Sequence, residues 1–179
     1  MSQDLPSIRP YLANDMEQVL RLETSFTTNE VYRVKRDGDS FLIAPERVSE
    51  SRLKVFDLRE ELIAADWDEA YVAVRPDGVV GFTATKFVAW HRRQGLQHLY
   101  VSPDWRRRGV GAALLSAVKA RAVQNGASHV WLETTNVNVP GVLAYRRMGF
   151  ELCGLDVSFY RGTPEDGEVG LLMSLDLDN

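Results

Sequence analysis

The stretch Leu99–Val118, LYVSPDWRRRGVGAALLSAV, constrains this chain more than any other part of it. Its apolar beginning predicts a strand that ends at Val101, because Pro103 cannot continue the hydrogen-bonded ladder. Three arginines and the sequence Gly109–Gly111 then lead directly into a helical pattern. The start of that helix has no N-cap side chain and no acid in its first turn, so its N–H groups and positive dipole end lack a side-chain partner. The stretch therefore predicts an anion-binding loop, for which a pyrophosphate is the simplest ligand.

Composition indicates a globular protein with an ordinary core. The chain has 179 residues, of which 45% are hydrophobic and 26% are charged, and this predicts a single domain over residues 1–179. Its net charge of −4 argues against nucleic acid as a partner, in spite of the local arginines. No apolar run reaches 18 residues and the N-terminus lacks a signal-peptide core, so we expect no membrane association and a cytoplasmic location.

The single cysteine excludes a disulfide framework and a paired-thiol metal site. Cys153 lies in the apolar run Phe150–Leu155, which predicts a buried and inert thiol. The histidines at 91 and 129 have no ligand spacing with each other or with Cys153, so no metal is expected.

The first third of the chain predicts short elements. In order, these are a strand at Ser7–Leu12, a helix capped by Asn14, a polar loop or ragged helix end at Ser25–Glu30, and a hairpin of Val31–Lys35 with Phe41–Ala44. The segment Glu46–Glu69 is rich in charge, which predicts a solvated helix or mobile flap with a short helix between Asp57 and Ala65. The alternative is a lid whose acids, Asp66, Asp68 and Glu69, attract a cationic substrate. Tyr32, Trp67 and Trp90 are candidates either for an acceptor pocket or for ordinary packing.

The central part predicts an antiparallel meander followed by one crossover. Strands at Ala70–Arg75, Val79–Ala89 and Leu96–Val101 precede the loop and its helix, and the apolar strand His129–Thr134 follows. A strand, a helix and a second strand imply parallel pairing, and ligands of such a unit lie at the carboxyl ends of its strands. Val101 and Glu133 belong to that edge.

The last part predicts another helix and two strands. Asn138 is the expected cap, Pro140 lies in the first turn and Gly149 ends the helix. The final strands are expected at Leu155–Tyr160 and Val169–Leu175, with an acidic turn between them. The fold class is thus mixed α/β, close to α+β: a mostly antiparallel central sheet with one parallel strand-helix-strand unit and helices on both faces.

Three kinds of phosphate site compete for the loop. A nucleotide triphosphate loop needs Gly-Lys followed by Ser or Thr, which the sequence lacks after Gly111. A dinucleotide fingerprint needs a third glycine where Leu114 stands, although Glu133 does lie near the position of a ribose-binding acid. The third pattern, R-x-x-G-x-G from Arg106 to Gly111 with Asn138, Tyr145 and Gly149-Phe150 downstream, resembles the GNAT superfamily of acetyl-CoA-dependent N-acetyltransferases.

The resemblance implies that loop amides hold the coenzyme A pyrophosphate, that backbone near Val101 pairs with the pantetheine arm, and that Tyr145 protonates the leaving thiolate. The residues assigned to acetyl-CoA on this basis are Leu99, Tyr100, Val101, Arg106, Arg107, Arg108, Gly109, Val110, Gly111, Ala112 and Asn138. The segments SFTTNEVYRV, LETTNVN, AYRRMGF and CGLDVSFYRGTPEDGE are further similar to the streptothricin acetyltransferases, which acetylate an amine of the antibiotic's β-lysine chain. That group carries adjacent Glu-Asp where this chain has Gln97 and His98.

Amine acetylation needs a proton acceptor. An alkyl ammonium has a pKa near 10.4, so only about one molecule in a thousand is neutral at physiological pH. Glu133 ends an apolar strand, where desolvation raises a carboxyl pKa, and the matching Glu of the superfamily acts as base; His98 is the rival. The sequence therefore predicts an N-acetyltransferase for a cationic small-molecule amine, streptothricin-like first, acting as a monomer or homodimer. Another amine acceptor, or a non-catalytic acyl-CoA-binding module, remains the alternative.

Overall fold

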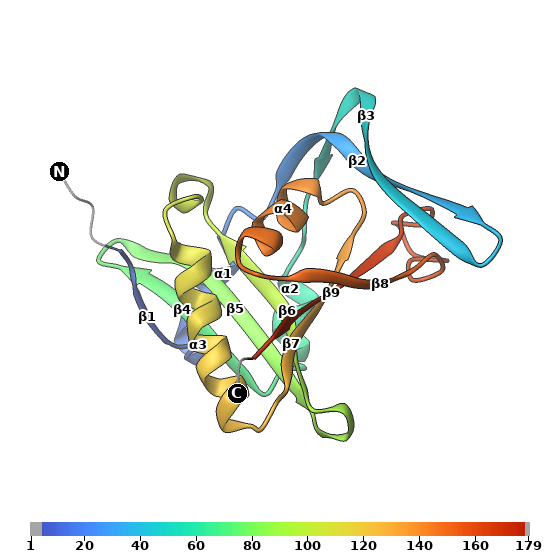
Figure 1. The fold of residues 1–179 in the computed structure, drawn as a ribbon. Helices are drawn as coiled ribbons and strands as arrows, with labels where there is room; N and C mark the ends of the chain where they lie inside the picture. Colours follow the sequence, from blue (N-terminus) through green and yellow to red (C-terminus); the bar gives the residue numbers. More distant parts are fainter. Residues whose placement is uncertain (1–4, 178–179) are drawn as a thin grey trace. The chain divides into compact units, whose positions relative to one another are not determined.

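The structure, a computed structural model, describes residues 5–177. The chain folds into two compact units. Figure 1 labels the helices and strands that make them up. The first unit comprises, among the described residues, 5–24, 56–131 and 176–177, and the second comprises 25–55 and 132–175. The strand β7 (His129–Thr135) begins in the first unit and continues into the second.

The first unit is built on a mixed sheet. Its strands are β1 (Ser7–Pro10), β4 (Glu69–Arg75), β5 (Gly78–Val88), β6 (Arg93–Val101) and the beginning of β7, in the order β1-β4-β5-β6-β7. Neighbouring strands are antiparallel except β6 and β7, which are parallel and pair Arg93–Gly95 with His129–Trp131. The helix α3 (Val110–Gln124) connects those two strands, because a parallel pair cannot be joined by a tight turn. The predicted strand-helix-strand unit is thus confirmed.

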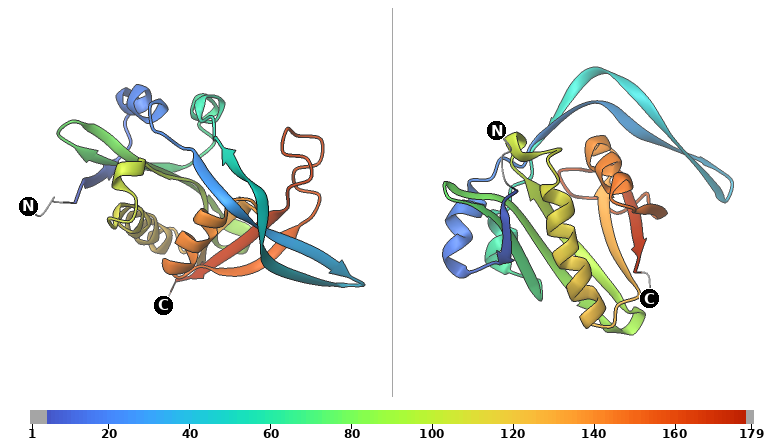
Figure 2. Two further views of the ribbon diagram at one scale, coloured as in Figure 1. Left: turned by 90° about the horizontal axis from the view of Figure 1, so that it is seen from above. Right: turned by 60° about the vertical axis from the view of Figure 1, so that its left-hand side comes forward.

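Helices cover both faces of this sheet, as predicted. Val72 packs with Val19 of α1 (Met16–Leu20) and Leu62 of α2 (Arg59–Ala64), whereas the next residue, Ala73, packs with Leu114 of α3. Successive residues of a strand point to opposite faces, so α1 and α2 lie on one side and α3 on the other (Figure 2). Three short 3₁₀ turns complete the unit: η1 (Ala13–Asp15), η2 (Ala89–His91) and η3 (Pro103–Trp105).

The second unit contains a long hairpin and the end of the chain. The hairpin pairs β2 (Phe26–Asp37) with β3 (Ser40–Lys54), and β9 (Gly170–Asp176) lies between β7 and β8 (Glu151–Asp156). The helix α4 (Val139–Arg147) contacts β2. The half-buried amide of Asn136 joins these pieces, because its Nδ2 donates to Tyr32 O at 2.9 Å and its Oδ1 accepts from Val169 N at 2.8 Å.

The hairpin corrects two predictions. Residues 25–30 do not form a loop or helix end, since Phe26 begins a 12-residue strand. The charged segment from Glu46 is not a helix or flap in its first part, because it continues β3 as far as Lys54. The charges sit on the exposed positions of a two-stranded ribbon, where Arg33 and Glu46 form a cross-strand ion pair at 2.7 Å. High charge content therefore did not distinguish a solvated helix from a solvated hairpin.

Three local predictions are also wrong. Asn14 does not cap the first helix; it lies inside η1, and the Asp15 side chain accepts the Leu12 N–H. The strand expected at 155–160 is instead β8, which ends at Asp156, where the carboxylate accepts hydrogen bonds from the backbone and hydroxyl of Ser158. Cys153 is exposed rather than buried, because β8 is the edge strand of its sheet.

Candidate active site

The anion-binding features of the loop are present in the first unit. Gly109 occupies the N-cap of α3 with φ +86°, a left-handed conformation that glycine adopts without strain. Ala113 makes the first helical bond, to Gly109 O, so the N–H groups of Val110, Gly111 and Ala112 have no partner inside the helix. The first turn has no acid and no side-chain cap. This backbone geometry fits a pyrophosphate, as coenzyme A carries.

The three arginines of the loop differ in what they contact. Arg106 donates from Nε to Val101 O at 2.9 Å and from Nη2 to Glu23 O at 3.1 Å, which ties the loop to the preceding strand. Arg108 lies over the ring of Trp105 at 5.3 Å. Arg107 is exposed and has φ +60°, an unfavourable conformation for a residue with a side chain. Two of the arginines thus stabilise the loop itself.

The backbone of β6 presents alternate residues in opposite directions. Ser102 N donates to Val80 O, which places the backbone polar groups of Tyr100 toward β5 and those of Leu99 and Val101 away from β5. The parallel ladder with β7 covers three pairs and ends at Gly95 on β6. The backbone N–H and C=O groups of Leu99 and Val101 therefore point to the side of β6 opposite β5. Among residues 5–177, no strand pairing is found on that side beyond Gly95.

The side chain of His98 is enclosed by aromatic rings in the first unit. Its ring lies 6.0 Å from Trp67, 6.2 Å from Phe82 and 6.1 Å from Tyr100, measured between centroids. Nδ1 lies 3.3 Å from Oε2 of Glu61, without the alignment of a hydrogen bond. Burial lowers the pKa of His98 to about 4. The imidazole is therefore neutral at physiological pH.

The acids proposed as cation-attracting lid groups are engaged within the first unit. Asp66 forms an ion pair with Lys86, Asp68 accepts the Phe87 N–H at 2.7 Å, and Glu69 forms an ion pair with Arg121. Asp66 and Asp68 thus contact the end of β5, and Glu69 connects β4 to the helix α3. Of the three aromatic candidates, Trp67 packs against the core, Tyr32 is buried in the second unit, and Trp90 is 84% exposed.

Glu133 lies near the end of β7 and is half-buried in the second unit. The hydroxyl of Tyr160 donates a hydrogen bond to its Oε1 at 2.7 Å. Burial raises the pKa of Glu133, the charge of Glu168 raises it further, and the Tyr160 hydrogen bond opposes both. A carboxylate with this environment is a stronger proton acceptor than an exposed one.

Tyr145 lies on α4 in the same unit as Glu133. Its ring makes an edge contact with Phe150, with centroids 5.7 Å apart. Burial, followed by the charge of Glu133, raises the pKa of Tyr145 to about 12. The two side chains are thus close enough to interact electrostatically, and the phenol remains protonated at physiological pH.

Asn138 is the N-cap of α4, as predicted. Its Oδ1 accepts the Gly141 N–H at 3.0 Å and its Nδ2 donates to Thr134 Oγ1 at 3.0 Å. A side chain at Gly141 would collide with this amide, so the pair is matched. The structure thus confirms the capping role of Asn138, and its assignment to the cofactor stays a prediction.

Sequence reasoning missed Tyr160 as a partner of Glu133. In the sequence, the segment FYRGTPEDGE contributes only to the similarity with the streptothricin acetyltransferases, and the pattern predicts Tyr160 at the end of a strand. It lies instead in the loop of residues 157–169, where Tyr160 O accepts hydrogen bonds from the backbone and hydroxyl of Thr163. A tyrosine 27 residues from Glu133 leaves no local signal of such a contact.

Comparison with known proteins agrees with these features. Residues 31–150 match the model of the acetyltransferase (GNAT) family. The chain is 39% identical over 177 residues to the streptothricin acetyltransferase of Streptomyces lavendulae, which covers 94% of this chain and 92% of that protein. The chain belongs to the GNAT family of acetyltransferases.

Two solved structures are similar to this GNAT chain over nearly its whole length. A nourseothricin acetyltransferase superposes with a TM-score of 0.88 and 40% identity, covering 96% of this chain and 98% of that one. A Bacillus anthracis protein in complex with acetyl coenzyme A superposes with a TM-score of 0.83 and 26% identity, covering 98% of this chain and 100% of that one. The chain is accordingly an acetyl-CoA-dependent N-acetyltransferase with a GNAT fold, and acetyl-CoA is its cosubstrate.

Within residues 5–177, no group of three or more His, Cys, Asp and Glu side chains is arranged to hold a metal ion. None of the helices in the described part of the chain is long and apolar enough to cross a membrane.

Proposed function

We propose that the enzyme acetylates a primary amine of a streptothricin-type, cationic small molecule, with Glu133 as proton acceptor and Tyr145 as donor to the leaving sulfur. The observation that carries the proposal is the half-buried Glu133 carboxylate, bonded to Tyr160 and coupled to Tyr145 within one unit. The 39% identity to a streptothricin acetyltransferase supports the choice of acceptor.

Glu133 is the proposed group that removes the proton from the substrate ammonium. The pKa of an alkyl ammonium, near 10.4, lies about three units above pH 7.4. Removing its proton at that pH therefore costs about 4 kcal/mol. A carboxylate beside the ammonium attracts it and accepts one of its protons, which leaves a lone pair on the nitrogen. The neutral amine then attacks the thioester carbonyl, and the C–S bond breaks as the thiolate leaves. The raised pKa of Glu133 makes that proton transfer less unfavourable than it would be to an exposed carboxylate.

His98 is the weaker candidate for the base. A proton acceptor works best when its pKa lies close to the working pH, and burial lowers the pKa of His98 to about 4. The shift of Glu133 runs in the opposite direction, toward the working pH. The environments of the two groups therefore favour Glu133.

Tyr145 is proposed to act on the thiolate that departs from the acetyl group. A phenol with a pKa of about 12 stays protonated, so it has a hydrogen bond to donate as negative charge develops on sulfur. An ordinary thiol has a pKa near 8.5, so complete transfer from this phenol costs about 5 kcal/mol. Donation of a hydrogen bond, with the proton following as the products leave, is the less costly route.

The first unit is proposed to hold acetyl-CoA mainly through backbone. The N–H groups of Val110, Gly111 and Ala112 bind the pyrophosphate, and the polar backbone groups of Leu99 and Val101 pair with the pantetheine amides. Support comes from the uncapped start of α3 and from the backbone direction of β6. Arg107 adds charge at the rim of this site.

The test is release of free coenzyme A thiol from acetyl-CoA in the presence of single amines: streptothricin, spermidine, lysine amide and an Ala-initiated peptide. We expect the highest kcat/KM with streptothricin, and a mass increase of one acetyl group on its β-lysine portion. Release with the other amines alone would contradict the proposed acceptor. Absence of release with every amine, together with tight acetyl-CoA binding, would favour a non-catalytic acyl-CoA-binding module.

A further inference from the structure

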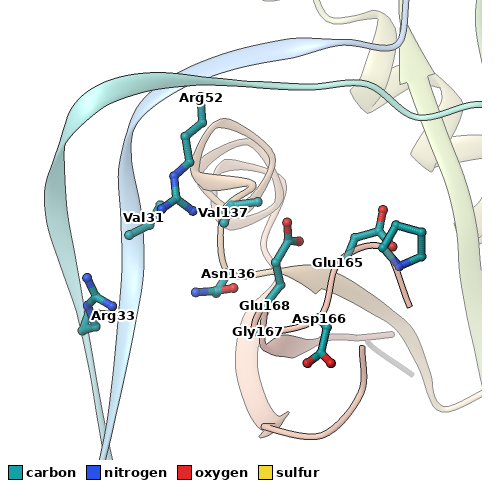
Figure 3. Close-up of a pocket in the computed structure, with 10 residues that line it drawn as sticks. Val31, Arg33, Arg52, Asn136, Val137, Glu165, Asp166, Gly167 and Glu168 are labelled. Atoms are coloured by element: carbon teal, nitrogen blue, oxygen red, sulfur yellow. The ribbon is translucent and has the colours of Figure 1, made fainter. Parts of the chain in front are cut away.

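The second unit contains a cavity of about 290 Å³ between the hairpin and the loop of residues 157–169 (Figure 3). Arg33 and Arg52 of the hairpin line one wall, and Glu165, Asp166 and Glu168 line the opposite wall. The volume is at the small end of the range for ligand pockets and suits a group of the size of one sugar or amino acid.

The cationic wall keeps one guanidinium available. Arg33 is bonded to Glu46 across the hairpin, with Nη2 to Oε1 at 2.7 Å, so its charge is already neutralised. Arg52 has no recorded ion-pair partner among residues 5–177, and its side chain points toward the cavity in Figure 3. An arginine in this position can donate hydrogen bonds to a carbonyl or hydroxyl oxygen.

The anionic wall likewise keeps one carboxylate available. Lys54 Nζ lies 3.0 Å from Glu168 and 3.4 Å from Glu165, so one ammonium serves two carboxylates. Asp166 accepts the Gly162 N–H at 3.3 Å and has no recorded ion-pair partner in the described part of the chain. The wall therefore has three carboxylates against the single ammonium of Lys54, and Asp166 is among the residues that line the cavity.

The cavity is built before any ligand arrives. Lys54 is only 17% exposed, and its ion pairs fasten β3 to the loop. Asn136 lines the cavity and bonds to Tyr32 on the hairpin and to Val169 at the end of the loop. Thr135 donates a hydrogen bond to Glu168. Both walls are thus fixed to the end of β7, which lowers the conformational cost of binding there.

The same strand and the same loop carry the proposed acceptor chemistry. Glu133 precedes Asn136 by three residues on the chain, and Tyr160, which bonds to Glu133, belongs to the loop that forms the anionic wall. Glu168 of that wall interacts electrostatically with Glu133. The proposed proton acceptor and the anionic wall of the cavity are thus built on the same strand end and the same loop.

We propose that this cavity is a second subsite for the acceptor, which binds the part of the amine substrate that is not acetylated. Asp166 binds a cationic group of that part, an ammonium or guanidinium, and Arg52 binds a neighbouring carbonyl or carbamoyl oxygen. The inference rests on the proposed function and adds to it the reason why a large, polyfunctional acceptor is preferred over a simple amine.

A subsite away from the reacting atoms binds the acceptor equally well in the ground state and in the transition state. Its loss therefore raises the KM for the acceptor and leaves kcat unchanged. Loss of one charged hydrogen bond at an exposed site corresponds to about a 10-fold loss of affinity. The subsite can act only on acceptors long enough to enter it, so a truncated amine serves as an internal control.

The experiment compares Asp166→Asn and Arg52→Gln with the parent enzyme, using streptothricin and β-lysine amide as acceptors. Matched controls are Asp39→Asn in the turn of the hairpin and Arg47→Gln on β3, which is 84% exposed and lies outside the cavity. We expect both cavity variants to raise the KM for streptothricin about 10-fold, with kcat, the KM for acetyl-CoA and all constants for β-lysine amide unchanged. The controls are expected to match the parent enzyme.

An unchanged KM for streptothricin in both cavity variants, or an equal loss with β-lysine amide, would overturn the proposal. Calorimetric titration of streptothricin into the coenzyme A-bound proteins separates this failure from failure of the proposed function. If the parent enzyme binds streptothricin without acetylating it, the proposed function fails, and the subsite stands only if Asp166→Asn binds more weakly than Asp39→Asn. If the parent enzyme does not bind streptothricin, the subsite is wrong as well.

Discussion

The proposed phosphate loop of the first unit and the proposed carboxylate site of the second unit use different parts of the polypeptide. The loop offers backbone N–H groups at the start of α3, and its arginines Arg106 and Arg108 contact the protein itself. The carboxylate site depends on side chains, because Glu133 acquires its raised pKa from burial and from neighbours on other elements. Backbone sites tolerate substitution and serve a constant ligand, whereas side-chain sites are tuned residue by residue. Single side-chain substitutions should therefore have large effects on turnover in the second unit and small effects on cosubstrate binding in the first.

The largest effect is expected at Glu133. Glu133→Gln removes the proton acceptor while keeping the shape, so kcat should fall about 100- to 10,000-fold, with the KM for acetyl-CoA unchanged within about twofold. Steady-state kinetics of thiol release measures both. Glu151→Gln, an exposed change at the start of β8 in the same unit, is the matched control and should keep full activity. A Glu133→Gln enzyme with more than a tenth of the parent kcat would contradict the comparison.

The next effect is expected at Tyr145. Tyr145→Phe removes one hydrogen bond to a developing thiolate, which is worth about 1.5–3 kcal/mol, so kcat should fall about 10- to 100-fold. The dissociation constant of acetyl-CoA, measured by calorimetry, should stay near the parent value, because the proposed contacts of the cosubstrate lie mainly in the first unit. An equal loss in binding and turnover would show instead that Tyr145 holds the cosubstrate.

Tyr160→Phe should give a smaller fall in kcat, about three- to tenfold, together with a change in pH dependence. The Tyr160 hydrogen bond favours the ionised carboxylate and so lowers the pKa of Glu133 against the effect of burial. Its removal raises that pKa, so the acidic limb of kcat against pH should move to higher pH. If the acidic limb stays in place or moves to lower pH, the Tyr160 hydrogen bond does not lower the pKa of the catalytic carboxyl group as proposed.

The smallest effect is expected at Arg107. Arg107→Gly relieves a side chain held at φ +60° and should raise the free energy of unfolding by about 1 kcal/mol, or the Tm by about 2–4 °C. Arg107→Gln removes the same charge without relieving the backbone and should not raise the Tm. Both should weaken coenzyme A binding less than about fivefold by calorimetry. A larger loss in both variants would mean that side-chain charge, not backbone, dominates the phosphate site.

Much of the first unit could be predicted from sequence because its signals are local. The uncapped helix start, Pro103 and Gly109 lie within a few residues of one another, and the apolar face Leu114, Leu115, Val118 and Ala122 is fully buried as the spacing predicts. The parallel pairing of β6 with β7 follows from a helix between two strands. Short-range steric and hydrogen-bonding rules are sufficient for such features.

The second unit was harder to predict because its signals are distant. The sequence predicts a loop at the beginning of β2 because residues 27–30 are polar, and only their pairing with the distant strand β3, as between Glu30 and Arg47, makes them a strand. Cys153 was expected to be buried because its neighbours are apolar, but its strand is at the edge of a sheet. Neither fact can be read from a window of the sequence, because strand neighbours are chosen by the whole chain.

For this protein, local sequence was enough to predict an anion-binding loop on a strand-helix-strand unit. The resemblance to the GNAT superfamily nominated Glu133 and Tyr145, with His98 as the rival base. The folded chain then separated the candidates. Burial among distant elements moves the pKa of Glu133 upward, against the opposing hydrogen bond from Tyr160, which lies 27 residues away. Enclosure by Trp67 and Phe82 moves the pKa of His98 down to about 4. The reason is physical: hydrogen-bonding patterns of the backbone are encoded within a few residues, but desolvation and charge at a side chain depend on everything packed around it.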